Sequence, residues 1–328
     1  MRIAVTSVAC ENLAKHNVAK PNGWRYFTIH DRVRINEWNP NMVVCLGWFC
    51  TGWSEWQNHK ACFGDTKKII IQWVGSDILV LKQAYDRGHK AIVEWLKDPR
   101  FLHVAPTQES IQEMAWTGFK FYGPVDVPAE HLIDPQPMPE KVRLAIYMPP
   151  NRQDFYGIKL MIDVLPKFKD VDIVFYHWLP QSEGLQYGRR HEEHFALTRE
   201  EYEEKILAGC SALVRIPVHD AGSISVGEFL MAGKPVITNQ SLPHWKYGIK
   251  GNLYVTETGD AFALAPGAHK KFEAEVARII DLVKNSKEPV PQKTMDYYRE
   301  AYDPANYAKK LSEYTQDHWG VSIEPSAG

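Results

Sequence analysis

Residues 219–237 read HDAGSISVGEFLMAGKPVI, and this stretch shows how the second half of the chain folds. An apolar run, Ser211 to Ile216, comes before it, and a helix is expected to begin near Gly222. The residues Gly233-Lys234-Pro235 then end that helix ahead of the apolar run Val236 to Thr238. The stretch therefore predicts strand, loop, helix and strand, which is the repeating unit of a parallel sheet covered by helices.

Two acidic residues, Asp220 and Glu228, flank the expected start of this helix. Free backbone N–H groups and the positive end of the helix dipole suit a diphosphate at such a place. The residues that carry these N–H groups are Gly222, Ser223, Ile224 and Ser225. Glu228 can accept hydrogen bonds from a vicinal diol with its two carboxylate oxygens. The alternative is that Asp220 only caps the helix and that Glu228 is a solvated helix residue. The complete pattern favours a site for a phosphorylated, hydroxyl-rich ligand.

Length and composition limit the kind of protein. A chain of 328 residues with 45% hydrophobic residues exceeds the size at which one core usually divides, so we expect two domains. No apolar run reaches the roughly 18 residues that span a bilayer. The start, Met1 to Val5, has the pattern of a strand and not of a signal peptide, so we expect a cytoplasmic protein. A net charge of −2 supplies no general field for nucleic acid.

The five cysteines are odd in number and form no C-x-x-C pair. This pattern indicates neither a disulfide framework nor a zinc ribbon. Cys45, Cys50, His59 and Cys62 are the alternative, because they could gather around a metal ion. Their spacing matches no standard set of ligands, so we expect no metal site.

Along the chain, apolar runs alternate with amphipathic segments, which is typical of an α/β protein. We expect strands at 2–8, 42–47, 68–74, 101–105, 142–148 and 171–177, and helices at 78–87, 91–96, 107–117, 159–166 and 197–209. A proline-rich stretch that ends at Pro139 is the best linker. The expected units are a first Rossmann-like domain at 1–138, a second at 139–304 and a helical tail at 305–328.

The string from Asp220 to Ile237 resembles the donor-site signature of retaining GT-B glycosyltransferases, written E-x(7)-E followed by a G-x-P-V-I turn, as in the family 4-like group. In that family the first acid lies near the donor sugar and the second holds the nucleotide ribose. The positions correspond here to Asp220 and Glu228, and Asp220 is one methylene shorter than the usual Glu. The resemblance implies two Rossmann-like domains that face a cleft, with a C-terminal helix that crosses back to the first domain.

The same resemblance covers most of the chain. In GT-B enzymes a basic pair after the first strand of the second domain meets the donor diphosphate, and Arg152 and Lys159 match it by position and type. Fixed cations stabilise the negative charge of a departing nucleoside diphosphate without a metal ion. The alternative is that both are ordinary surface cations.

In the first domain, a strand that ends in Gly75-Ser76-Asp77 is similar to an element that faces the cleft in small GT-B members. Asp77 either caps the next helix or touches substrate. Trp48 and Trp53 belong to an aromatic segment that could stack on an acceptor or fill the core. The family often presents a histidine near the sugar; Gln72 stands where one would be sought, and the sequence does not choose among His30, His59 and His103.

We therefore expect a glycosyltransferase, hexosyl or pentosyl, that moves a sugar from a UDP- or GDP-linked donor to a hydroxyl acceptor with retention of configuration and without a required cofactor. The acceptor is a glycan, a small molecule or a hydroxymethylated base in phage-type DNA, which would need extrusion from the helix. Two alternatives stay open: a non-catalytic GT-B-shaped binding protein and a sugar-nucleotide epimerase.

Overall fold

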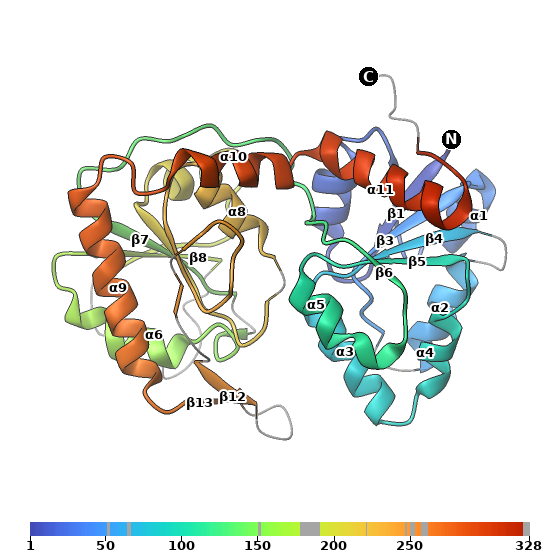
Figure 1. The fold of residues 1–328 in the computed structure, drawn as a ribbon, viewed down its shortest axis with the longest axis horizontal. Coiled ribbons are helices and arrows are strands. Elements are labelled where there is room, and N and C mark those ends of the chain that lie inside the picture. The colour runs from blue at the N-terminus through green and yellow to red at the C-terminus, as the bar shows by residue number, and fades with distance from the viewer. Residues whose placement is uncertain are drawn as a thin grey trace. The chain divides into compact units, whose positions relative to one another are not determined.

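The computed structural model describes residues 1–50, 53–63, 67–149, 152–177, 191–220, 222–246, 248–249, 253–256 and 262–323, without the side chains of Arg32, Trp53, Thr256 and Phe262. The chain forms two compact units (Figure 1). Unit 1 comprises Met1–Leu132, Ala221–Ile224 and Glu300–Gly328, and unit 2 comprises Ile133–Asp220 and Ser225–Arg299.

Unit 1 is built around a six-stranded parallel sheet with the order β2-β1-β3-β4-β5-β6. Its strands are β1 (Ile3–Ser7), β2 (Arg25–Thr28), β3 (Met42–Leu46), β4 (Lys68–Gln72), β5 (Phe101–Val104) and β6 (Phe121–Tyr122). Its helical segments are η1 (Leu13–Ala19), α1 (Arg32–Trp38), α2 (Trp53–Phe63), α3 (Ser76–Asp86), α4 (Lys90–Leu96), α5 (Gln108–Glu113), η2 (Ala115–Thr117) and α11 (Pro304–Trp319).

Successive residues of each strand point to opposite faces of this sheet, and both faces are buried. Val43 and Ile71 face a core that is completed by α1 to α4. Val44 and Ile70 face a second core, which is closed by η1 and by Leu311 of α11. The C-terminal helix thus packs on the first sheet, as the family resemblance implies.

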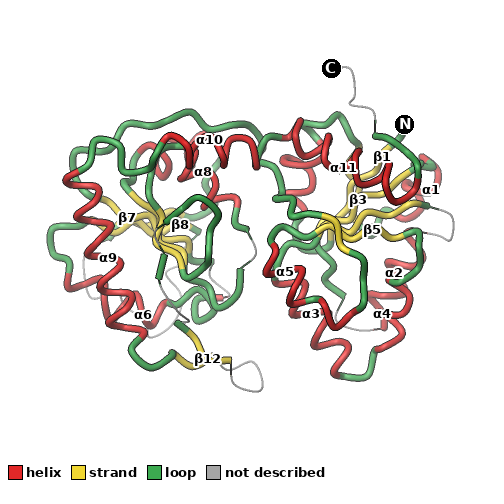
Figure 2. Tube along the Cα trace, viewed as in Figure 1, coloured by secondary structure: helices red, strands yellow, loops and turns green. Residues whose placement is uncertain are grey.

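Unit 2 has a five-stranded parallel sheet with the order β11-β10-β7-β8-β9 (Figure 2). Its strands are β7 (Arg143–Tyr147), β8 (Asp172–Tyr176), β9 (Glu192–His194), β10 (Ala212–Arg215) and β11 (Val236–Thr238), with a separate hairpin of β12 (Tyr254–Thr256) and β13 (Phe262–Leu264). Its helical segments are α6 (Ile158–Val164), η4 (Leu165–Lys167), α7 (Arg199–Glu201), η5 (Tyr202–Ala208), α8 (Ile224–Met231), α9 (Ala268–Asn285) and α10 (Gln292–Ala301). The first residue of α8 and the last two of α10 cluster with unit 1.

The turn after α8 has an additional role. Gly233 adopts a φ of 77°, which suits a residue that ends a helix. The side chain of Lys234 is completely buried, and its Nζ donates hydrogen bonds to the carbonyl groups of Leu207, Ala208 and Cys210. Lys234 therefore satisfies carbonyl groups at the C-terminal end of η5 that would otherwise lack a donor.

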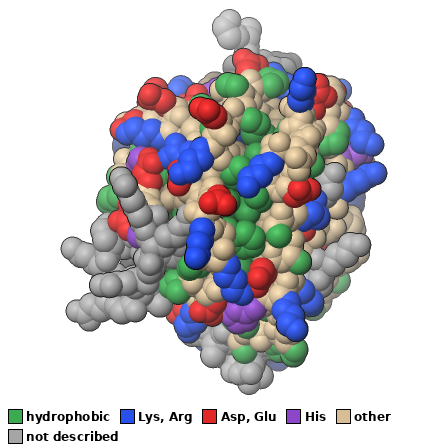
Figure 3. Space-filling model, turned by 90° about the vertical axis from the view of Figure 1, so that its left-hand side faces the viewer, with side chains coloured by type: hydrophobic (Ala, Val, Ile, Leu, Met, Phe, Trp, Pro, Cys, Tyr) green, Lys and Arg blue, Asp and Glu red, His purple; other side chains and the backbone are tan. Residues whose placement is uncertain are grey.

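The predicted α/β fold is confirmed, and most predicted elements lie within two residues of the observed ones. The sequence predicts no helix in the aromatic segment, whereas the structure has α2 beginning at Trp53. Within the described ranges, no helix combines the length and the apolarity needed to cross a membrane. On the face drawn in Figure 3, acidic and basic side chains are interspersed.

Candidate functional site

The strand β10 carries an arginine at its carboxyl end. Arg215 Nε donates a hydrogen bond to Asp220 Oδ2 at 2.7 Å, and each side chain is 10% exposed. Burial favours loss of the Arg215 proton, but the adjacent Asp220 carboxylate outweighs burial and raises the pKa of Arg215. The first predicted acid is therefore held by a cation from the strand that precedes it.

Two tyrosine rings enclose the Arg215 guanidinium. Its Cζ lies 4.9 Å from the ring centroid of Tyr147 and 5.1 Å from that of Tyr156. The two rings meet edge to face, with centroids 5.2 Å apart. Cation–π attraction and exclusion of water hold this guanidinium in one position.

The second predicted acid is buried in unit 2. Glu228, on α8, is only 2% exposed, so it is not a solvated helix residue. Its Oε1 lies 2.5 Å from Arg199 Nη1, and its Oε2 accepts a hydrogen bond from Tyr202 Oη at 3.0 Å. Burial raises the pKa of Glu228, and the charge and hydrogen bonds of Arg199 and Tyr202 oppose that rise.

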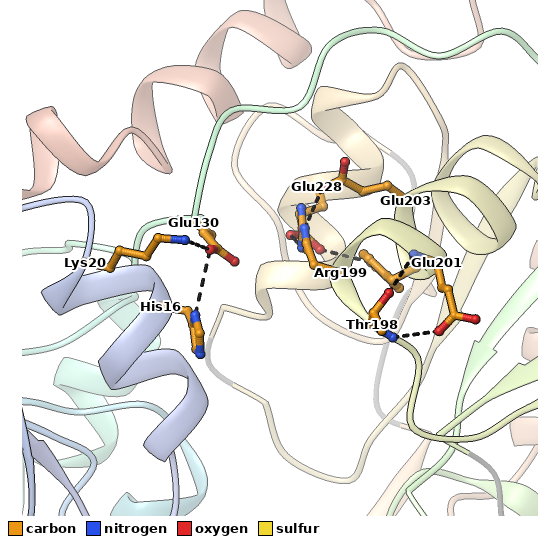
Figure 4. A network of polar contacts seen from close by, with 9 residues as sticks. His16, Lys20, Glu130, Thr198, Arg199, Glu201, Glu203 and Glu228 are labelled. Carbon is orange, nitrogen blue, oxygen red and sulfur yellow. Dashed lines mark hydrogen bonds and ion pairs between the residues drawn. The ribbon is translucent and has the colours of Figure 1, made fainter.

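The position of Arg199 follows from its local sequence. Thr198 and Glu201 form a capping box that fixes the first turn of α7, and Arg199 lies within that turn. Figure 4 shows the Arg199 side chain extended toward Glu228, and its Nε also contacts Glu203 at 2.5 Å. The Arg199 Nη2 atom is buried and has no hydrogen-bond partner among the described residues.

The two cations predicted for a diphosphate have different surroundings. Arg152 is exposed, and its Cζ lies 6.0 Å from the ring centroid of Phe155. The Phe155 ring in turn packs against Tyr156, one of the two rings around Arg215, with centroids 5.4 Å apart. Burial raises the pKa of Tyr147, and the charge of Arg152 opposes that rise. Lys159 is 70% exposed, and its Nζ lies 3.5 Å from the equally exposed Asp154.

The predicted helix start is shifted by two residues, since α8 begins at Ile224. Gly222 adopts a φ of 78°, and a Cβ placed on it would lie 2.6 Å from Asp126 Oδ1. Ser223 is buried, and its carbonyl accepts a hydrogen bond from Tyr302 Oη at 3.2 Å. Ser225 is half-buried, and the chain passes from unit 1 to unit 2 between Ile224 and Ser225.

In unit 1, Asp77 organises the turn after β4. It is fully buried and accepts hydrogen bonds from the backbone N–H groups of Trp48, Val74 and Ile78 at 2.8, 3.1 and 3.1 Å. Burial raises its pKa to about 6, and these backbone donors oppose the rise. Gly75, at a φ of 111°, allows the turn, and Ser76 begins α3.

The Trp48 ring is a core residue and not a surface for stacking on a ligand. It is 0% exposed, and its centroid lies 4.2 Å from that of His59. Apolar packing explains this outcome, because the ring joins the core between the first sheet and its helices. Trp53 begins α2, and its side chain lies outside the described part of the structure.

The three candidate histidines differ in burial. His59 and His103 are buried, and burial lowers the pKa of each to about 4. His30 is exposed. Gln72 is fully buried and donates a hydrogen bond from Nε2 to the carbonyl of Val125 at 3.1 Å.

The alternative metal site is not formed by its candidate ligands. Over the described ranges, no group of three or more His, Cys, Asp or Glu residues is placed to hold a metal ion. Burial raises the pKa of the Cys62 thiol to about 11 and raises that of the Cys45 thiol well above its ordinary value.

The three residues that contact the two predicted acids are absent from the sequence prediction: Arg199, Tyr202 and Arg215. The only signal for Arg215 is a charged residue inside the otherwise apolar run that forms β10. Arg199 and Tyr202 precede Glu228 by 29 and 26 residues, and only the tertiary fold brings them to it.

The fold matches solved structures along nearly its whole length. Sucrose-phosphate synthase from Thermosynechococcus elongatus aligns with a TM-score of 0.68 and 11% identity, over 98% of this chain and 100% of that chain. Anabaena HepE in complex with UDP-glucose aligns at 0.65 and 12%, over 97% and 100%. The lipopolysaccharide outer core galactosyltransferase WaaB aligns at 0.59 and 13%, over 97% and 99%. No protein-family model and no curated protein matches the sequence. The chain therefore has the GT-B fold, as its sequence predicts.

Proposed function

We propose that this protein is a glycosyltransferase that moves a sugar from a nucleoside diphosphate sugar to a hydroxyl acceptor. The observation that carries the proposal is the state of Glu228, a buried carboxylate held by Arg199 and Tyr202 at the predicted ribose position of a GT-B fold. Solved structures that share the fold support it, because they include a galactosyltransferase and a protein in complex with UDP-glucose.

The chemistry of Glu228 fits a ribose. A carboxylate oxygen has two lone pairs, so Arg199 and Tyr202 leave one acceptor site on each oxygen for the 2′- and 3′-hydroxyls. The charge of Arg199 opposes the rise in the pKa of Glu228 that burial causes. We assign the ribose to Glu228 and contact with the donor sugar to Asp220.

In this proposal, cations and backbone N–H groups bind the diphosphate. Arg152, Lys159 and the N–H groups of residues 222–225 are the donors that the sequence predicts for it. In the reaction, a bond forms from the acceptor oxygen to the anomeric carbon, and the bond from that carbon to the diphosphate oxygen breaks. The acceptor proton passes to the departing diphosphate, whose charge Arg152 stabilises. We infer retention of configuration from the resemblance of the string from Asp220 to Ile237 to the retaining donor-site signature. We infer no required metal because cations of the protein can take the role that a metal ion has elsewhere.

The donor is UDP- or GDP-linked, and the acceptor is a glycan or small molecule, or a hydroxymethylated base in DNA. The test is to incubate the protein with a panel of UDP- and GDP-sugars and to measure thermal shift and release of nucleoside diphosphate. Parallel reactions contain simple glycosides, hydroxymethylated DNA or no acceptor. Acceptor-dependent release supports the proposal. Binding without release would indicate a non-catalytic binding protein, and conversion of the sugar without an acceptor would indicate an epimerase.

A further inference from the structure

Arg215 has hydrogen-bonding capacity that its own unit does not use. Its side chain is nine-tenths buried, and Asp220 engages only Nε. Within the described ranges, neither terminal nitrogen, Nη1 or Nη2, has an acceptor, and neither is among the atoms sealed from solvent. A guanidinium that is anchored through Nε presents its two terminal nitrogens side by side in a rigid plane.

This geometry suits an anion with paired oxygens. Two parallel N–H groups of a guanidinium bind phosphate through two charge-assisted hydrogen bonds. Tyr147 and Tyr156 shield the cation from water, so its field is weakened less than that of an exposed cation. Asp220 fixes the plane of the guanidinium without occupying the terminal nitrogens.

Arg215 is better placed than Lys159 to bind an anion. Lys159 is 70% exposed and pairs with an exposed carboxylate, so solvent and salt screen its charge. Arg215 is rigid and desolvated. Arg152 Cζ lies 6.0 Å from the ring centroid of Phe155, and that ring lies 5.4 Å from the Tyr156 ring beside Arg215. These two arginines thus supply charge to one place at the carboxyl ends of β7 and β10.

We propose that Arg215 is a diphosphate-binding residue of the donor site, with Asp220 as the residue that positions it. The proposal rests on the proposed function and extends it, because Arg215 is outside the basic pair that the sequence predicts. Loss of the Arg215 charge therefore weakens binding of the diphosphate group and leaves recognition of the nucleoside unchanged.

The test is calorimetric titration of the full chain with UDP, GDP, uridine, guanosine and inorganic pyrophosphate. The variants are Arg215→Met, which keeps much of the volume without the charge, and Arg215→Lys, which keeps the charge without the paired donors. Arg278→Met is the matched control, because Arg278 makes its own bidentate ion pair with Glu275 on α9, outside the site. Circular dichroism and thermal unfolding establish that each variant is folded.

We expect Arg215→Met to weaken binding of the nucleoside diphosphate and of pyrophosphate at least tenfold, with nucleoside affinity unchanged. The Arg278→Met control should bind all ligands like the wild type. If Arg215→Met fails to fold, Arg215→Lys decides, with an expected loss of at least threefold for diphosphates alone. A folded Arg215 variant with wild-type affinity for diphosphates overturns the proposal.

The titrations with different ligands also test the role of Arg215 and the proposed function independently of each other. Tight nucleotide binding that is indifferent to Arg215 leaves the proposed function in place and removes the role of Arg215. Pyrophosphate binding that depends on Arg215, without any nucleotide binding, keeps the anion site and removes the proposed donor. A wild-type protein that binds none of these ligands contradicts both.

Discussion

Arg199 Nη1 lies 2.5 Å from Glu228 Oε1 in the second α/β unit. The two residues are 29 positions apart in the sequence, one in the first turn of α7 and the other in the middle of α8. Because Glu228 is almost fully buried, this contact orients the carboxylate and opposes the rise in its pKa that burial causes. The ribose binding that we propose for Glu228 therefore depends on Arg199.

The first prediction concerns the charge of Glu228. Glu228→Gln removes the partner of Arg199 and the anionic acceptor that we propose for two ribose hydroxyls, so donor KM should rise at least about tenfold, which is ~1.4 kcal/mol of binding free energy. Steady-state kinetics with the active nucleotide sugar measures this change. Glu203→Gln is the matched control, because it removes the other acidic partner of Arg199 and leaves Glu228 intact. An equal KM for wild type and Glu228→Gln would refute the ribose assignment.

The second prediction concerns Arg152. Replacement by alanine removes the cation that we propose stabilises charge on the departing diphosphate, so kcat should fall by about 10- to 100-fold. Rapid quench of a single turnover separates this loss from a change in donor affinity. Lys167→Ala, an exposed cation that pairs with Glu273, should keep the wild-type kcat. Unchanged single-turnover rates in Arg152→Ala would exclude Arg152 from the chemical step.

The third prediction concerns acid stability. His103 Nδ1 accepts a hydrogen bond from Trp73 Nε1 at 3.3 Å, and Nε2 faces the carbonyl of Leu96 at 2.9 Å, so the neutral ring is satisfied on both sides. Burial lowers its pKa from 6.5 to about 4. The folded state thus binds the proton more weakly than the unfolded state does. The contribution of His103 to the free energy of unfolding is fully present above pH 6.5. It is lost as the pH falls from 6.5 toward 4.

Urea unfolding at pH 7, 6 and 5 measures this loss. In His103→Gln, the decline of the unfolding free energy below pH 6.5 should be shallower than in the wild type by up to about 1.4 kcal/mol per pH unit. His269→Gln replaces a half-exposed histidine that pairs with Asp163 and should keep the wild-type slope. A slope in His103→Gln as steep as in the wild type would show that His103 does not control acid sensitivity.

The fourth prediction concerns the turn after α8. Lys234→Met removes the donor to three carbonyl groups, at least two of them in buried surroundings, and should lower the unfolding free energy by at least about 2 kcal/mol. Guanidinium chloride unfolding measures the change. Lys167→Met, with its half-exposed ion pair, should stay within about 0.5 kcal/mol of wild type. Equal losses in both variants would contradict a structural role specific to Lys234.

The sequence predicts the α/β architecture because its signals are local. Gly233-Lys234-Pro235 ends a helix by backbone geometry, and apolar runs such as Met42 to Leu46 form strands that are buried on both faces. Segments with mixed signals do not determine their secondary structure locally. The stretch from Trp53 to Phe63 is rich in aromatic and polar residues, which gives weak helical periodicity, and tertiary packing decides that it is α2.

The site was predictable only in part. Spacing identified Asp220 and Glu228, because both lie near one helix start. It could not identify Arg199 or Arg215, whose partners depend on how α7 and β10 pack in unit 2. Trp48 is buried in the core. The sequence does not predict this, because large aromatic residues after a strand give the same pattern whether their rings face water or the core.

The most direct test of the account is release of nucleoside diphosphate from a nucleotide sugar, measured by chromatography for the wild type and for folded Glu228→Gln. The account predicts that the wild type releases UDP or GDP when a hydroxyl acceptor is present and that Glu228→Gln does so at least about tenfold more slowly at subsaturating donor. Equal release by the two proteins, or no release by the wild type from any UDP- or GDP-sugar with the glycan, small-molecule and DNA acceptors, would contradict it.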